Sequence, residues 1–220
     1  MQKQGIIAVW KPKGPTSHDI VGMVRRATGE RRVGHAGTLD PLAEGILVIG
    51  IGKEATTTLS EHVAKEKEYV ADVRLGVTST TDDNEGDKKE VLPVRIPTKE
   101  EVRNALNPFV GKISQIPPAY SALKIKGTPA YKLAREGKAP EMKAREVEIK
   151  EVELLKYEWP DLSVRVVTGP GVYIRSLARD LGLALQTAGY LSGLVRTRVG
   201  EYTKEIALSV EELKPAQERV

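Results

Sequence analysis

The chain has 220 residues, 40% of them hydrophobic and 29% charged, which is typical of a globular protein with one large domain or two small ones. It contains no cysteine, and its three histidines lack the spacing of paired zinc ligands, so disulfides and cysteine nucleophiles are excluded and no metal site is expected. The net charge of +4 and the isoelectric point near 9.1 are compatible with a polyanionic partner, although many ordinary proteins share them.

The beginning of the chain lacks the apolar run of a signal peptide. No segment approaches the roughly 20 apolar residues that a membrane span needs. We therefore expect a cytoplasmic protein with no membrane partner.

Hydrophobic periodicity predicts strands and helices along the first half of the chain. In chain order they are a strand at 5–10, a helix at 18–28 capped by Ser17 or Asp19, a loop from Gly34 into a strand at 46–52, a helix at 53–64, a strand at 67–76 with Tyr69, Ala71, Val73 and Leu75 on one side, and a solvated acidic loop at 78–90.

The second half adds a helix at 98–109 opened by a Thr98–Glu101 capping box, an extended segment at 115–127, a short helix at 129–137, strands at 147–155 and 162–167, a helix at 173–186 that buries Ile174, Leu177, Ala178 and Leu181, a strand at 194–203, and a terminal helix opened by Ser209 and Glu212. Strands and helices alternate irregularly, which predicts an α+β fold with a mixed, mainly antiparallel sheet flanked by helices. Since neither an internal repeat nor a linker is visible, we expect a single domain over residues 1–220, of the size of a catalytic domain.

The stretch GHAGTLDPLAEGIL, residues 34–47, places Asp40 at the mouth of an apolar strand. Aspartate before proline commonly initiates a turn, and for a residue taken alone this is the more frequent role. The alternative is a carboxylate held on a rigid loop as a nucleophile or general base. His35 by itself is a weak signal.

The stretch GPGVYIRSLARDLG, residues 169–182, leads through a Gly-Pro-Gly turn into a helix. Its free amides are suited either to a phosphate or to a simple strand-to-helix turn. Arg175, in the first helical turn, is poorly placed for the helix dipole and indicates a specific anionic partner. Asp40 is the partner we expect, because an arginine would keep that carboxylate ionised and oriented.

Aromatic and basic residues leave two interpretations open. Tyr69 and Tyr120 suit core packing or a stacking platform for a base. Basic pairs suit solvated faces or a groove that follows phosphates, and they are Lys11 with Lys13, Arg25 with Arg26, Arg31 with Arg32, Lys124 with Lys126, and Arg196 with Arg198. Residue types alone therefore indicate a domain that faces nucleic acid, without naming a reaction.

The motifs together resemble those of the TruB-type tRNA pseudouridine synthases, in the family's order and spacing, over nearly the whole chain to about Thr203. They are VWKPKGPTSHDIVGMVRR, GHAGTLDPLAEGILVIGIGKEAT, KEYVADVRLGVTSTTDD, PPAYSALKIKGTPAYKLAREG, VYIRSLARDLG and LSGLVRTRVGEYT. The aspartate-bearing motif is highly specific, and it favours a reactive Asp40 over a turn-former.

The resemblance implies that a uridine at position 55, in the T-loop of tRNA, is flipped out, detached from its ribose, turned and rejoined through carbon. Asp40 would be the nucleophile, attacking either the sugar or the base, and no cofactor is expected. Tyr69 would stack on the flipped base and remove the proton from its C5. His35 would enter the space that the base vacates.

The resemblance also assigns the remaining pocket residues. Arg175 would pair with Asp40, and Tyr173 and Leu194 would line the pocket. Lys11 and Pro12 match the opening motif and would support the pocket, whereas Tyr120 receives no chemical role.

Two departures from the family pattern accompany these matches. Val172 stands where the family usually has a small polar residue, and the sequence after the catalytic region is too short for the C-terminal PUA domain of many bacterial members. We expect a monomer of the bacterial stand-alone branch, with tRNA as partner. The alternative is a tRNA-binding, RNA-folding chaperone with little or no catalysis.

Overall fold

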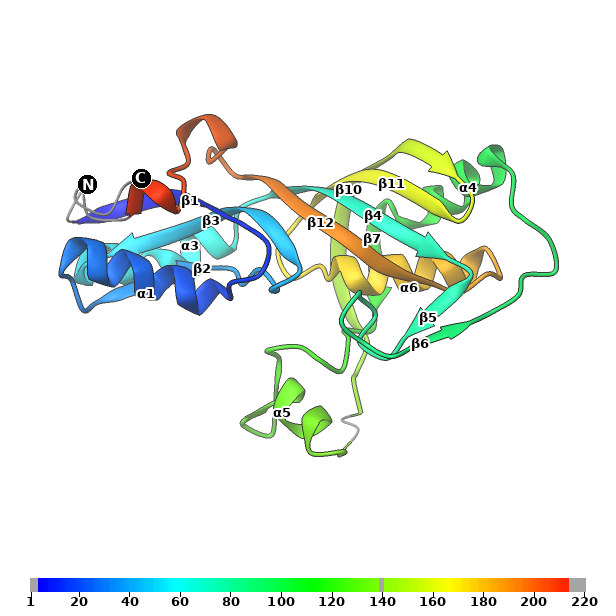
Figure 1. Cartoon of the computed structure of the whole chain (residues 1–220), viewed down its shortest axis with the longest axis horizontal. Helices are drawn as coiled ribbons and strands as arrows, with labels where there is room; N and C mark the ends of the chain where they lie inside the picture. Colours follow the sequence, from blue (N-terminus) through cyan, green and yellow to red (C-terminus); the bar gives the residue numbers. More distant parts are fainter. Residues whose placement is uncertain (1–3, 139–140, 214–220) are drawn as a thin grey trace. The chain divides into compact units, whose positions relative to one another are not determined.

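The computed structural model describes residues 4–138 and 141–213, and the chain falls into two compact units. The first unit comprises residues 1–70 and 194–220, and the second comprises residues 71–193. Strands β4 (Lys67–Leu75) and β12 (Gly189–Val199) each have residues in both units (Figure 1). A single catalytic domain over the whole chain stays a prediction.

Among the described residues, an eight-stranded sheet has the order β1-β3-β12-β4-β11-β10-β7, with β2 paired to β3 in addition. Strand β3 pairs antiparallel with both β1 and β2, and β10 pairs antiparallel with both β11 and β7, while β12 runs parallel to β3. The predicted α+β class with a mixed, mainly antiparallel sheet is confirmed.

The first unit also contains short helices and turns around its strands. Its elements are β1 (Gly5–Lys11), α1 (Ser17–Thr28), β2 (Val33–Ala36), β3 (Ala43–Ile51), α2 (Lys53–Thr57), α3 (Leu59–Val63) and the 3-10 turns η2 (Lys204–Ile206) and η3 (Glu211–Leu213). Helix α1 lies against the strands of this unit (Figure 1). Its apolar face packs on β1 and β3, where Ile20 and Val24 are buried in one cluster with Leu47 and Ile49. Each such side chain contributes roughly 1.5–3 kcal/mol through burial.

The second unit is built on a long antiparallel hairpin. Its elements are β5 (Val77–Ser79), β6 (Lys88–Glu90), α4 (Lys99–Leu106), η1 (Asn107–Phe109), β7 (Gly111–Gln115), β8 (Lys124–Ile125), β9 (Thr128–Pro129), α5 (Ala130–Arg135), β10 (Arg145–Glu158), β11 (Asp161–Thr168) and α6 (Ile174–Ala184). The Thr98–Glu101 capping box of α4 is confirmed, as is the apolar stripe of α6, which buries Ile174, Leu177, Ala178 and Leu181.

Four local predictions were wrong. Thr16, rather than Ser17 or Asp19, caps α1, with Asp19 completing the capping box. Residues 34–36 belong to strand β2 instead of a loop, since their backbone pairs with β3. The helix expected at 53–64 is divided at Thr58 into α2 and α3.

The fourth wrong prediction is the solvated acidic loop at 78–90, which contains strands β5 and β6 and a buried aspartate, Asp83. At the other end of the chain, Ser209 and Glu212 form the predicted capping contacts, but the segment is the 3-10 turn η3 as far as Leu213. Residues 214–220 of the expected terminal helix lie outside the described residues. No helix within residues 4–138 and 141–213 has the length and apolarity to cross a bilayer.

Candidate active site

Asp40 lies half-buried in the turn that connects β2 to β3. The Ala43 backbone N–H donates to the Asp40 carbonyl over 3.1 Å, closing the turn at the start of β3. Ser17, buried at the start of α1, ties the loop from the other side: its Oγ donates to the Leu39 carbonyl and accepts from the Leu39 N–H, both at 2.9 Å. The backbone on both sides of Asp40 is therefore held, as a reacting carboxylate requires.

Gly45 permits the close approach of β12 beside this loop. Its φ is +115°, and a Cβ there would lie 2.2 Å from the carbonyl oxygen of Arg196, the residue paired with it in the parallel register. Any side chain at this position would push the two strands apart, so glycine is required here.

Lys11 is a fully buried cation close enough to Asp40 to interact with its charge. The Lys11 ammonium donates to the carbonyl of Ala43 over 2.6 Å and to that of Pro12 over 2.9 Å. Burial lowers the pKa of Lys11 to about 8, and the negative charge of Asp40 opposes that decrease. Lys11 thus supports the start of β3, and its positive charge interacts with that of Asp40.

Arg196, only 1% exposed, is the second buried cation that interacts with Asp40. Its Nε donates to the Ile46 carbonyl over 2.7 Å, and its Nη2 donates to the Gly37 carbonyl, in the Asp40 loop, over 3.0 Å. The guanidinium is also hydrogen-bonded to Tyr69. Burial lowers the pKa of Arg196, although both Tyr69 and Asp40 favour its charged form.

Lys67, 6% exposed on β4, adds a third cation to the interior of the first unit. Its Nζ donates to the carbonyls of Val63 and Lys65, both at 2.7 Å. Burial, followed by the charge of Arg196, lowers the pKa of Lys67 to about 8. Neither Lys67 nor an interior role for Arg196 was predicted from the sequence.

Tyr69 and Leu194, both predicted pocket residues, are nearly buried at 7% and 8% exposure. The Tyr69 phenol is held by the Arg196 guanidinium. Leu194 on β12 lies opposite Ala43 in the parallel register. Ala43 is the first residue of β3 and follows Asp40 by three residues. Arg196 therefore connects the nucleophile candidate with the tyrosine.

His35 is half-buried on β2, opposite Ile49 of β3. Burial lowers its pKa, and the charges of His18 and Arg196 lower it further, so the imidazole is neutral at pH 7. Its Nδ1 is buried without a hydrogen-bond partner among the described residues. His35 thus presents a neutral ring that interacts with the charge of the same arginine that contacts Tyr69.

Arg175 and Tyr173 belong to the second unit, so their position relative to Asp40 stays a prediction. Within that unit Arg175 forms an almost fully buried ion pair with Asp83, Nη1 to Oδ2 at 3.2 Å. The guanidinium also donates to the carbonyls of Tyr120 (2.9 Å) and Thr81 (3.3 Å). Asp83 lies in the segment predicted to be a solvated loop, and sequence reasoning missed it.

Tyr173 precedes α6 and is fixed by two residues that sequence reasoning also missed. Gln115, 1% exposed at the end of β7, accepts from the Tyr173 N–H over 2.8 Å and donates to its carbonyl over 3.1 Å. The Arg145 guanidinium lies over the Tyr173 ring, 4.8 Å from its centroid, and donates to the Gly171 carbonyl. Since Gln115 occupies the Tyr173 amide, that amide is not available to a phosphate at the helix start.

No group of three or more histidine, aspartate or glutamate side chains within the described residues is arranged to hold a metal ion. The residues gathered around Arg196 are instead suited to a reaction at a carboxylate. The charge of the half-buried Asp40 interacts with two interior cations, one of which is hydrogen-bonded to a tyrosine, and such an arrangement is suited to nucleophilic or acid–base chemistry.

Comparison with known proteins identifies the class to which the chain belongs, the pseudouridylate synthases. The family model described as TruB family pseudouridylate synthase (N terminal domain) matches residues 25–174, well over half of the chain. The model of the tRNA pseudouridylate synthase B C-terminal domain matches residues 175–220. The chain belongs to the TruB family, as its motifs predicted.

Individual relatives agree with this assignment. The tRNA pseudouridine synthase B of Mycobacterium sp. (strain KMS) is 47% identical over 213 residues, covering 95% of this chain and 71% of the relative. That of Thermobifida fusca (strain YX) is 46% identical over 217 residues, covering 95% and 74%. A solved H/ACA RNP bound to a substrate RNA containing 2'-deoxyuridine has a chain that is 28% identical with a TM-score of 0.69, over 94% of this chain but only 51% of that one.

Proposed function

We propose that this enzyme isomerises the uridine at position 55, in the T-loop of tRNA, to pseudouridine, with Asp40 as nucleophile on a flipped-out base. Membership of the TruB family and relatives named tRNA pseudouridine synthase B support the reaction and the tRNA substrate. The observation that supports the proposed role of Asp40 is that buried Arg196 holds its loop through the Gly37 carbonyl, while the charges of Lys11 and Arg196 interact with that of Asp40.

The reaction balances within the substrate itself. The bond between N1 of uracil and C1′ of ribose breaks, a bond between C5 and C1′ forms, the C5 proton is lost, and N1 gains a proton. Because no electrons are gained or lost, the residues need to supply only a nucleophile, a base and a pocket. The Asp40 carboxylate adds to the sugar or to the base, and both routes end in the same product.

The remaining side chains have roles that their chemistry supports. Tyr69 stacks on the flipped uracil and accepts the C5 proton, while Arg196 holds its phenol in place. His35, neutral and half-buried, enters the space that the base leaves and offsets part of the unstacking cost of a few kcal/mol. Leu194 and Tyr173 line the pocket.

Arg175 completes the proposed site by pairing with Asp40 and fixing its orientation. A guanidinium has donors on several edges, so Arg175 has the capacity to bind a second carboxylate while it remains bonded to Asp83.

The test is tritium release from a tRNA transcript labelled at uridine C5, with native protein, Asp40→Asn and Asp161→Asn measured side by side. Asp161 is the matched control, because its carboxylate forms only an exposed ion pair with Arg74. We expect release by the native protein and the control, no release by Asp40→Asn, and pseudouridine mapped to the T-loop.

Substantial release by Asp40→Asn would show that Asp40 is not the nucleophile. Tight tRNA binding without release by the native protein would favour the RNA-folding chaperone instead. Release with pseudouridine at another position would retain the enzyme class and overturn the choice of uridine.

A further inference from the structure

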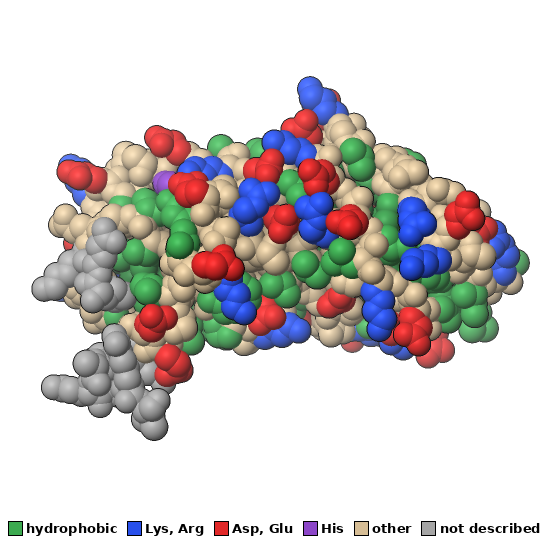
Figure 2. Space-filling view, turned by 90° about the horizontal axis from the view of Figure 1, so that it is seen from above, with side chains coloured by type: hydrophobic (Ala, Val, Ile, Leu, Met, Phe, Trp, Pro, Cys, Tyr) green, Lys and Arg blue, Asp and Glu red, His purple; other side chains and the backbone are tan. Residues whose placement is uncertain are grey.

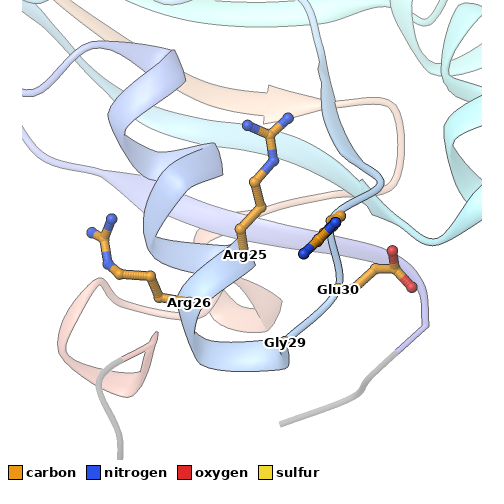
Figure 3. A pocket seen from close by; sticks show the side chains of 5 residues that line it. Arg25, Arg26, Gly29 and Glu30 are labelled. Carbon is orange, nitrogen blue, oxygen red and sulfur yellow. The ribbon is translucent and has the colours of Figure 1, made fainter.

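The C-terminal end of α1 carries a cluster of arginines that the proposed active site does not use. Arg25 and Arg26 lie in the last helical turn, and Arg31 and Arg32 follow the left-handed Gly29 that ends the helix. All four arginines are exposed. Figure 3 shows Arg25 and Arg26 extending from the helix in different directions, with Glu30 on the chain segment beyond Gly29.

These residues surround a hollow of about 360 Å³, which is lined by Arg25, Arg26, Gly29, Glu30 and Arg31. A hollow of this size accommodates a phosphate group together with part of the sugar attached to it. We refer to Arg25, Arg26, Arg31 and Arg32 as the arginine cluster.

The arginine cluster is not neutralised by the described part of the chain. None of its four guanidinium groups forms an ion pair with a described carboxylate, whereas Arg74, Arg95, Arg165, Arg179 and Arg198 all do. Charges of both signs are interspersed over the face seen in Figure 2, which is the usual arrangement of a solvated surface. The cluster differs from that arrangement.

Glu30, the one acid in this segment, is engaged with the backbone. Its Oε1 accepts from the Arg32 N–H over 2.7 Å. Arg25 is anchored in turn, because its Nη2 donates to the Val33 carbonyl over 2.9 Å. The segment is therefore ordered by its backbone contacts, and its guanidinium groups remain available to a ligand.

The helix dipole explains only half of the cluster. Cations in the last turn of a helix are stabilised by its negative end, which accounts for Arg25 and Arg26. Arg31 and Arg32 lie beyond the helix, where this effect does not reach. Four like charges within eight residues are unfavourable for each other, and a polyanion would remove that repulsion.

We propose that the arginine cluster binds phosphates of the tRNA backbone, away from the uridine that reacts. This inference rests on the proposed function, since it takes the substrate to be tRNA. Guanidinium groups bind phosphates through paired hydrogen bonds, and such contacts position an RNA without reading its sequence. The cluster contributes affinity, while the chemical step is carried out elsewhere in the molecule.

The test compares the triple variant Arg26→Gln/Arg31→Gln/Arg32→Gln with native protein in equilibrium binding to tRNA between 50 and 200 mM salt. None of the three side chains makes a hydrogen bond to the described protein, so the fold is retained, which an unchanged thermal midpoint checks. The matched control is Lys99→Gln/Arg103→Gln, which removes exposed cations from α4.

The triple variant should bind at least about tenfold more weakly at 100 mM salt, and its plot of log K against log salt should be shallower by nearly three, because each of the three phosphate contacts contributes nearly one to the slope. The control should change affinity by less than about twofold. At saturating tRNA, the turnover rate should equal that of the native protein.

An unchanged affinity and slope in the triple variant, with normal turnover by the native protein, would overturn this inference and leave the proposed function intact. A changed slope together with no turnover by the native protein would retain the phosphate contacts and reject the proposed reaction.

Discussion

Replacing Asp83 with alanine should destabilise the second unit and displace Arg175. The two side chains are only 4% and 7% exposed, and removing one partner of a buried ion pair costs about 3–5 kcal/mol. Two backbone carbonyls, of Tyr120 and Thr81, still accept from Arg175 in the variant. We therefore expect the lower end, about 3 kcal/mol, which corresponds to a decrease in Tm of roughly 6–12 °C.

A double-mutant cycle with Arg175→Met separates the ion pair from general damage. Urea unfolding of the native protein, both single variants and the double variant gives the coupling energy between the two positions. Because a buried pair replaced on both sides by apolar groups is often neutral, the double variant should be more stable than Asp83→Ala alone. A loss below about 1 kcal/mol in Asp83→Ala, as for a surface pair, would refute this account of Arg175.

Three further predictions concern single positions. The pKa of Lys67 is about 8 in the folded protein and 10.5 in the unfolded chain, so the unfolded state binds more protons between these pH values and the free energy of unfolding rises with pH. In Lys67→Met, the increase in this free energy from pH 8 to 10.5, measured by urea unfolding, should be smaller by about 3 kcal/mol than in the native protein. An equal increase in both proteins would contradict the buried, depressed pKa of Lys67. Gly45→Ala should cost about 3 kcal/mol or more by the same measurement, whereas Gly29→Ala, with nothing within 4 Å of its new Cβ, should cost about 1 kcal/mol. Arg145→Met should lower kcat/KM roughly fivefold through the Tyr173 ring and have no effect in a Tyr173→Leu background, so equal losses in both backgrounds would show that the cation–π contact is irrelevant.

Hydrophobic periodicity predicted the type of an element correctly where that element buries one face. The alternation from Tyr69 to Leu75 predicted β4, and the stripe from Ile174 to Leu181 predicted α6, because in both cases side-chain burial repeats with the period of the backbone. Strand β2 has only four residues, including a glycine, and is defined by its hydrogen bonds to β3. No local pattern reports such a partner, and the segment was therefore predicted as a loop.

The prediction of a solvated loop at residues 78–90 was wrong for a related reason. The composition of this segment is that of a solvated loop, and local sequence patterns carry no information on which distant residues the segment contacts. Asp83 is buried because its carboxylate meets Arg175, 92 residues further along the chain. The first-turn position of Arg175 did indicate an anionic partner, and the structure supplies one in Asp83. The pairing of Arg175 with Asp40 stays a prediction.

The position of Arg196 in the sequence could have predicted its burial near a carboxylate. Side chains two residues apart on a strand face the same side, so Arg196 shares a face with Leu194, a predicted pocket residue. A cation on the buried face of a strand is stable only when hydrogen bonds and a nearby anion compensate its desolvation. The Ile46 and Gly37 carbonyls provide the first, and Asp40 provides the second. An arginine on the buried face of this strand therefore predicts a nearby carboxylate, and Asp40 is one whose charge stabilises the Arg196 guanidinium.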